Sequence, residues 1–216
     1  MPAAGDRRSP LQNRVTPFGD LAAVSARGLF MGNRGGRFHT DVKTLTNRRW
    51  ASRQWICCLL DFKGRHRNVW GRFYTELFFL DEPTALAAGH RPCFECRRQD
   101  ALVFAARWQA SFGLEAPPRA DEMDVILHQE RRRGRAKRLH RRDIDALPDG
   151  AFIASEEGAF AVRGESLLRW TPEAYDARRP KSRGIKVDVL TPPAILAILS
   201  AGYQPHWHPS AAAFST

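Results

Sequence analysis

Cys93 and Cys96 are the residues of this 216-residue chain whose types and spacing point most directly to chemistry. They stand in a Pro-Cys-x-x-Cys sequence after a predicted helix and a turn at Gly89, and Arg97 and Arg98 follow them at once. Two thiolates at this spacing can bind one metal ion from a single turn of backbone, and Zn2+ is the usual ion. The sequence therefore predicts a small zinc site in this segment.

The two remaining cysteines, Cys57 and Cys58, lie in a buried strand predicted over residues 55–62. No apolar secretory segment begins the chain, so we expect a reducing cytoplasmic location and metal ligation in place of disulfides. Neighbours in a strand point to opposite faces, so both thiols reach one ion only if the backbone turns sharply. The ligand set is therefore Cys93, Cys96 and Cys57 or Cys58. The fourth ligand is the other cysteine or one of three histidines, namely His39, His66 or His90.

The elements that must position these thiols indicate an α+β fold. Asp81 is a suitable cap for a helix with Pro83 in its first turn and Gly89 at its end. The runs 69–73 and 74–80 are rich in aromatic and branched residues and predict strands. We expect a small antiparallel sheet with a zinc-bound Cys-x-x-Cys at the N-terminus of a helix that runs to about residue 112.

Further along the chain we expect a helix over 121–130 and then the densest run of charge, residues 131–142. Such a run repels itself, which predicts a solvated linker or a mobile arm. After a turn at 148–150, short strands and one helix over 194–201 indicate a smaller C-terminal β-rich module. The expected units are therefore a zinc-binding domain over 1–115 with an irregular arm at 1–30, a helix and basic linker over 116–149, and the module at 150–216.

The block from Phe78 to Arg98 resembles the zinc-binding N-terminal domain of the Ada DNA-repair proteins, with a partial match over about residues 55–98. The matching positions are Phe78-Phe79, Ala85, Ala88-Gly89, Arg91-Pro92-Cys93 and Cys96. The resemblance implies a zinc site that uses two upstream cysteines, a DNA partner and a role in repair or damage sensing. It also implies that Cys57 or Cys58 would be the methyl-accepting cysteine. The family's upstream ligands are three residues apart, whereas these two are adjacent, and its regulator and alkyltransferase domains are absent.

The charge of the chain independently favours nucleic acid as the partner. Its 34 lysines and arginines against 23 acidic residues give a net charge of +11. No apolar run approaches the roughly 18 residues of a membrane span. We expect DNA more than RNA, and no membrane partner; the oligomeric state stays open. The expected phosphate contacts are Arg91, Arg97, Arg98, Arg131, Arg132, Arg133, Arg135, Lys137, Arg138, Arg141 and Arg142. Several tryptophans, Trp50 among them, are candidate stacking platforms for unpaired bases.

Two other functions compete with nucleic-acid binding. His206 and His208 alternate near the C-terminus, so on a strand they would share a face and could act as base and orienting group. A metal-dependent hydrolase, nuclease or base-modifying enzyme would use them or an open position on zinc. A regulatory interaction module would instead hold a purely structural zinc. Four protein ligands would close the site, whereas three would leave a place for water.

Overall fold

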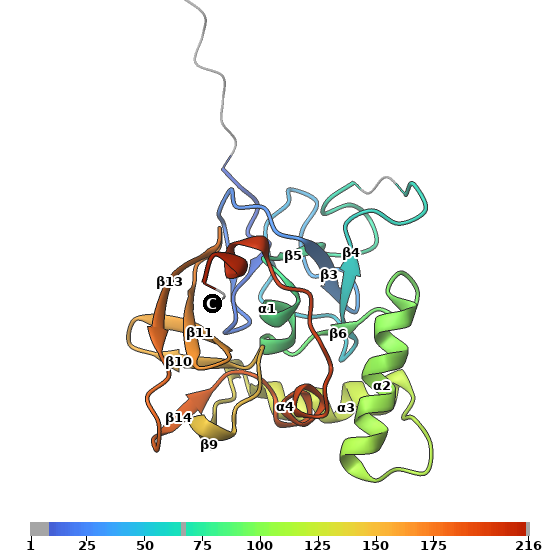
Figure 1. The fold of residues 1–216 in the computed structure, drawn as a ribbon. Helices are drawn as coiled ribbons and strands as arrows, with labels where there is room; N and C mark the ends of the chain where they lie inside the picture. The colour runs from blue at the N-terminus through green and yellow to red at the C-terminus, as the bar shows by residue number, and fades with distance from the viewer. Residues whose placement is uncertain (1–8, 66–67, 215–216) are drawn as a thin grey trace, which may run out of the picture.

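The structure is a computed structural model that describes residues 9–65 and 68–214. The fold is mixed α+β, as predicted, and within these residues it contains two six-stranded sheets, one two-stranded hairpin and four α-helices. No helix in the described part of the chain has the length and apolarity needed to cross a bilayer. The two larger sheets lie on either side of a short central helix (Figure 1).

The first sheet is formed by strands within residues 14–92 and positions the cysteines. In spatial order its strands are β2 (Leu21–Ala22), β1 (Arg14–Val15), β5 (Leu77–Phe79), β3 (Phe30–Arg34), β4 (Trp55–Leu59) and β6 (Arg91–Pro92). β4 and β6 are parallel, and Cys57 is paired with Pro92. This register places the Cys-x-x-Cys turn, which follows β6 directly, beside the two cysteines of β4.

The second sheet is antiparallel throughout and uses a segment that was expected to be a linker. Its strands in order are β13 (Tyr175–Pro180), β12 (Ser166–Trp170), β11 (Gly158–Arg163), β10 (Phe152–Ser155), β14 (Lys186–Val189) and β9 (His140–Asp143). The charged run also forms the hairpin of β7 (Arg132–Arg133) and β8 (Ala136–Lys137). The structure therefore corrects the prediction of a linker or mobile arm over 131–142, because parts of this segment pair as strands. Backbone pairing of β9 with β14 orders the segment while its side chains stay mostly at the surface.

Four α-helices connect and cover the sheets: α1 (Glu82–Ala87), α2 (Arg98–Phe112), α3 (Ala120–Arg131) and α4 (Pro193–Ser200). The predicted start of α1 is confirmed, because Asp81 accepts a hydrogen bond from the Thr84 amide at 3.0 Å. Every residue of α1 is buried. Ala85 packs into the core of the first sheet, Ala87 into that of the second, and Leu86 into the core among α2, α3 and α4. This one buried helix, which lies at the centre of the fold, thus contributes side chains to three hydrophobic cores (Figure 1).

The C-terminal segment is fastened to the start of α1. The Tyr203 hydroxyl donates to Glu82 at 2.7 Å, and the amide of His206 donates to the same carboxylate at 2.9 Å. Asp81 accepts from the Tyr175 hydroxyl at 2.9 Å and from the His208 amide at 3.1 Å. Residues 150–214 therefore share hydrogen bonds and core with the segment that carries the cysteines.

Candidate metal centre

Three of the four cysteines converge at the end of the first sheet. The sulfur atoms of Cys58, Cys93 and Cys96 all lie within 4.8 Å of one another. Cys58 comes from β4, whereas Cys93 and Cys96 come from the turn between β6 and α2. Sulfurs at about 2.3 Å from a tetrahedral Zn2+ are about 3.8 Å apart, so this spacing suits three corners of one metal site. These residues are close enough to bind one metal ion.

The backbone around the cluster donates to the sulfurs. The Leu59 amide donates to Cys96 Sγ at 3.4 Å, and the Glu95 amide donates to Cys93 Sγ at 3.4 Å. A hydrogen bond donated to a sulfur stabilises its thiolate form, which is the form that binds metals. Hydrogen bonds from Cys58 and Cys96 lower the pKa of Cys93, whereas hydrogen bonds with Cys93 and Cys96, together with burial, raise the pKa of Cys58.

Cys57 does not belong to the cluster, which corrects the expected set of four cysteine ligands. Its side chain is fully buried on the opposite face of β4, where it packs against Leu77 and Phe79. Its sulfur accepts a hydrogen bond from Arg97 Nη1 at 3.4 Å, and burial raises the pKa of its thiol. The strand continues through Cys57 and Cys58 without a sharp turn, so the alternation of side chains separates them.

The histidines proposed as substitute ligands are placed elsewhere or lie outside the described residues. His39 is buried, stacks on Trp70 and hydrogen-bonds with Thr75 Oγ1 at 2.7 Å. His90 is fully buried against Trp55. His66 falls outside the described residues. Within 9–65 and 68–214, no histidine or carboxylate joins the three sulfurs at ligand distance.

A cavity of about 710 Å³ adjoins the three sulfurs. Its other walls come mainly from the segment between β4 and β5 and include Arg72, Phe73 and Tyr74. Glu95, which stands between the two cysteines of the turn, also lines it and forms an ion pair with Arg65 at 2.7 Å. This volume falls in the range of small-molecule sites. The sulfurs therefore face a space with room for a fourth ligand or a small molecule.

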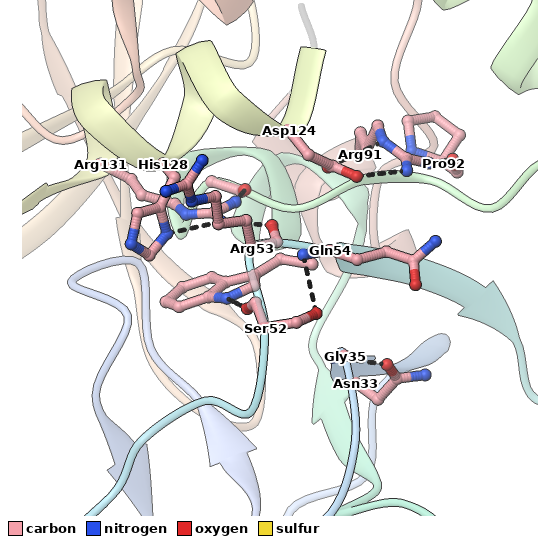
Figure 2. Close-up of polar contacts among 12 residues, drawn as sticks. Asn33, Gly35, Ser52, Arg53, Gln54, Arg91, Pro92, Asp124, His128 and Arg131 are labelled. Atoms are coloured by element: carbon pink, nitrogen blue, oxygen red, sulfur yellow. Dashed lines mark hydrogen bonds and ion pairs between the residues drawn. The ribbon is translucent and has the colours of Figure 1, made fainter. Parts of the chain in front are cut away.

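Three of the arginines expected to contact phosphates are inside the protein. Arg91 is 2% exposed and forms two hydrogen bonds with Asp124 (Figure 2). Arg97 pairs with the buried carboxylate of Glu82 at 2.8 Å. Arg131 is 1% exposed and donates to backbone carbonyls. The structure corrects the expectation for these three, because their donors are directed to internal acceptors.

The remaining expected contacts are at the surface, fully or in part. Arg132 and Lys137 are half-buried, and the Lys137 ammonium donates to the carbonyl of Ala87. The exposed members are Arg98, Arg133, Arg135, Arg138, Arg141 and Arg142. Two further arginines, Arg48 and Arg49, are exposed beside Trp50 and were not among the predicted phosphate contacts. The sequence feature that could have indicated them is a pair of arginines directly before a tryptophan.

The two C-terminal histidines do not line the cavity at the sulfurs. His206 Nε2 lies 3.6 Å from Asp100, whereas His208 Nδ1 hydrogen-bonds with Ser210 Oγ at 2.8 Å. No strand is formed over 203–208, so the shared face expected from alternation does not arise. Their catalytic role stays a prediction.

Comparison with known proteins places the chain in no family. No protein-family model matches it, no curated protein is significantly similar to it, and no solved structure matches its fold. The likeness of residues 55–98 to the Ada zinc domain therefore depends on the residues themselves.

Proposed function

We propose that the chain is a zinc protein that binds nucleic acid in the cytoplasm. Zn2+ would be held by Cys58, Cys93 and Cys96, the last of which lies two residues before α2. The convergence of these three sulfurs, with two backbone amides donating to them, is the observation that carries the metal assignment. Thiolate ligands favour zinc among the common divalent ions.

The charge of the surface supports the nucleic-acid part of the proposal. The net charge is +11, and exposed arginines gather on the hairpin of β7 and β8 and on β9. Arginine side chains of this kind contact phosphates without reading sequence. Within the proposal, DNA is the preferred partner, and the Ada resemblance favours a role in repair or damage sensing.

A salt series with duplex and single-stranded DNA tests this proposal. The logarithm of the affinity should fall linearly with the logarithm of salt concentration, with a slope of about −0.9 for each phosphate contacted on a duplex. The triple variant Arg133→Gln, Arg138→Gln, Arg141→Gln should flatten that slope by about 2 to 3 units. A control with the same charge change, at the exposed residues Arg107, Arg178 and Arg183, should leave it nearly unchanged. Absent or salt-insensitive binding would remove the proposal.

The cavity at the sulfurs favours a second candidate, a metal-dependent hydrolase, nuclease or base-modifying enzyme. Zn2+ with three protein ligands and an open position makes a bound water more acidic. In this chain, Glu95 and Glu76 are the carboxylates that line the cavity and could accept a proton. The variant Glu95→Gln should then abolish hydrolysis while retaining zinc. If DNA substrates stay intact with the wild-type protein, the site supports binding or folding alone.

A further inference from the structure

Two buried arginines lie together without an acidic partner. Arg34 is fully buried, and its guanidinium donates to neutral acceptors, including the Gly19 carbonyl at 2.8 Å. Arg131 likewise donates to two carbonyls and to His128 Nδ1 (Figure 2). Both guanidinium carbons stack on the indole of Trp55, at 3.9 and 4.0 Å from the ring centroid. In the part of the chain that the structure describes, neither forms an ion pair with a carboxylate.

The nearest carboxylates balance this positive charge only in part: Asp124 acts on Arg131 and Asp20 on Arg34, yet the pKa of each arginine stays below its usual value. Burial, followed by repulsion from Arg131 and Arg132, lowers the pKa of Arg34 well below its usual value. Burial and the same arginines have the same effect on the pKa of Lys137. Stacking on Trp55 offsets part of the cost, but an unpaired buried charge remains unfavourable. An anion bound nearby would relieve it.

An open cleft of about 610 Å³ lies directly against this buried cluster. The carbonyls of Gly19 and Arg49, which accept from Arg34, belong to residues that line the cleft. Four arginines and a tryptophan contribute to its walls, namely Arg48, Arg49, Arg132, Arg135 and Trp50. Asp20 is the one acidic residue among the lining residues that the structure describes. The cleft therefore has exposed arginines at its surface and buried cations behind it.

We infer that this cleft binds a phosphate group of a nucleotide, with the four arginines on the phosphate oxygens and Trp50 beside the base. Phosphate carries more charge than a carboxylate, and the planar fork of arginine matches its oxygens. Trp50 is half-buried and has the Arg132 guanidinium 4.8 Å from its ring centroid, so it is held in place for stacking. The volume suits one nucleotide.

The source of the phosphate is inferred to be a single strand of nucleic acid, and this step depends on the proposed function. A second hollow of about 670 Å³ shares Arg132 with the cleft and is lined also by Arg133, Lys137 and Arg138. Two basic hollows that meet at one arginine suit consecutive phosphates along a strand better than one free nucleotide.

Binding of three probes tests the inference: inorganic pyrophosphate, adenosine monophosphate and a fluorescent single-stranded oligonucleotide. The cleft variant is Arg48→Gln, Arg135→Gln, whose side chains are exposed, so folding should be unaffected. The control is Arg107→Gln, Arg183→Gln, with the same charge change at exposed positions outside the cleft. We expect pyrophosphate to bind the cleft variant at least about tenfold more weakly and the control as tightly as the wild type. Trp50→Leu should weaken the two probes that carry a base and spare pyrophosphate.

The probes separate the failure of this inference from that of the proposed function. Equal pyrophosphate binding by the cleft variant and the control would overturn the cleft as a phosphate site, even if the oligonucleotide binds elsewhere. Weaker binding of both pyrophosphate and the oligonucleotide would support the cleft and assign it to a strand. If the wild type fails to bind the oligonucleotide but the cleft variant loses pyrophosphate, the phosphate site stands, its source is a free nucleotide, and the proposed function falls.

Discussion

Replacing Asp124 with Asn should destabilise the protein strongly without weakening the proposed binding to nucleic acid. Asp124 lies in α3 and holds Arg91 of β6 through two hydrogen bonds, Nε to Oδ1 at 3.0 Å and Nη2 to Oδ2 at 2.7 Å (Figure 2). The side chains are 2% and 6% exposed. The Asp124→Asn variant keeps the shape of the side chain but leaves the Arg91 charge buried without a counterion.

Removing one partner of a buried ion pair typically costs about 3–5 kcal/mol, a large part of the roughly 5–15 kcal/mol that stabilises a folded domain. For a chain of this size the Tm should fall by about 6–20 °C. Urea and thermal unfolding measure the loss. The control is Asp121→Asn on the same helix, whose pairing with Arg119 is exposed, so its cost should stay below about 1 kcal/mol.

Nucleic-acid affinity, measured at a temperature where Asp124→Asn is folded, should match that of the wild type. The double variant Arg91→Met, Asp124→Leu should recover much of the lost stability, because it removes both charges together. A loss of stability below about 1 kcal/mol, combined with weaker binding, would show that Arg91 reaches the ligand and would refute its assignment as an internal residue.

Three further outcomes are expected. Stability should fall as pH drops from 6.5 towards 4, because burial among arginines lowers the pKa of His128 to about 4. The unfolded chain therefore binds the extra proton first. A plot of Tm against pH should be flatter for His128→Gln, and a slope identical to that of the wild type would contradict this. Tyr203→Phe should cost about 1–3 kcal/mol in urea unfolding, because the buried Glu82 loses a donor at 2.7 Å; a change within about 0.3 kcal/mol would count against it. Gly32→Ala should lower the Tm by several degrees, because the new Cβ would lie 2.1 Å from the Ile56 carbonyl oxygen; an unchanged Tm would refute this close approach.

Local signals in the sequence predicted the elements around the cysteines well. As expected, α1 begins after Asp81 and ends before Gly89, which takes the left-handed conformation with φ +88°. The apolar run that contains the cysteine pair is β4, and its side-chain alternation separates Cys57 from Cys58. These features depend on residues close together in the chain, where capping and alternation rules apply.

Features that depend on distant partners were not predictable in the same way. β9 exists because β14, more than 40 residues later, pairs with it, and the charge of its own residues predicted the opposite. The burial of Arg91 depends on Asp124 in another helix. The expected strand over 69–73 is irregular, with Trp70 at φ +57°, which lies outside the extended region of regular strands. Charge and propensity are properties of one segment, whereas its secondary structure and burial also depend on the distant segments that pair with it.

The metal content of two adjacent serine variants tests the central claim most directly. Elemental analysis of the purified wild type should find about one Zn2+ per chain, since three thiolates converge at a single site. Cys57→Ser should retain that zinc, because its sulfur lies on the other face of β4, and Cys58→Ser should lose it. A folded wild type without metal, or zinc that depends on Cys57 and survives the loss of Cys58, would contradict the account.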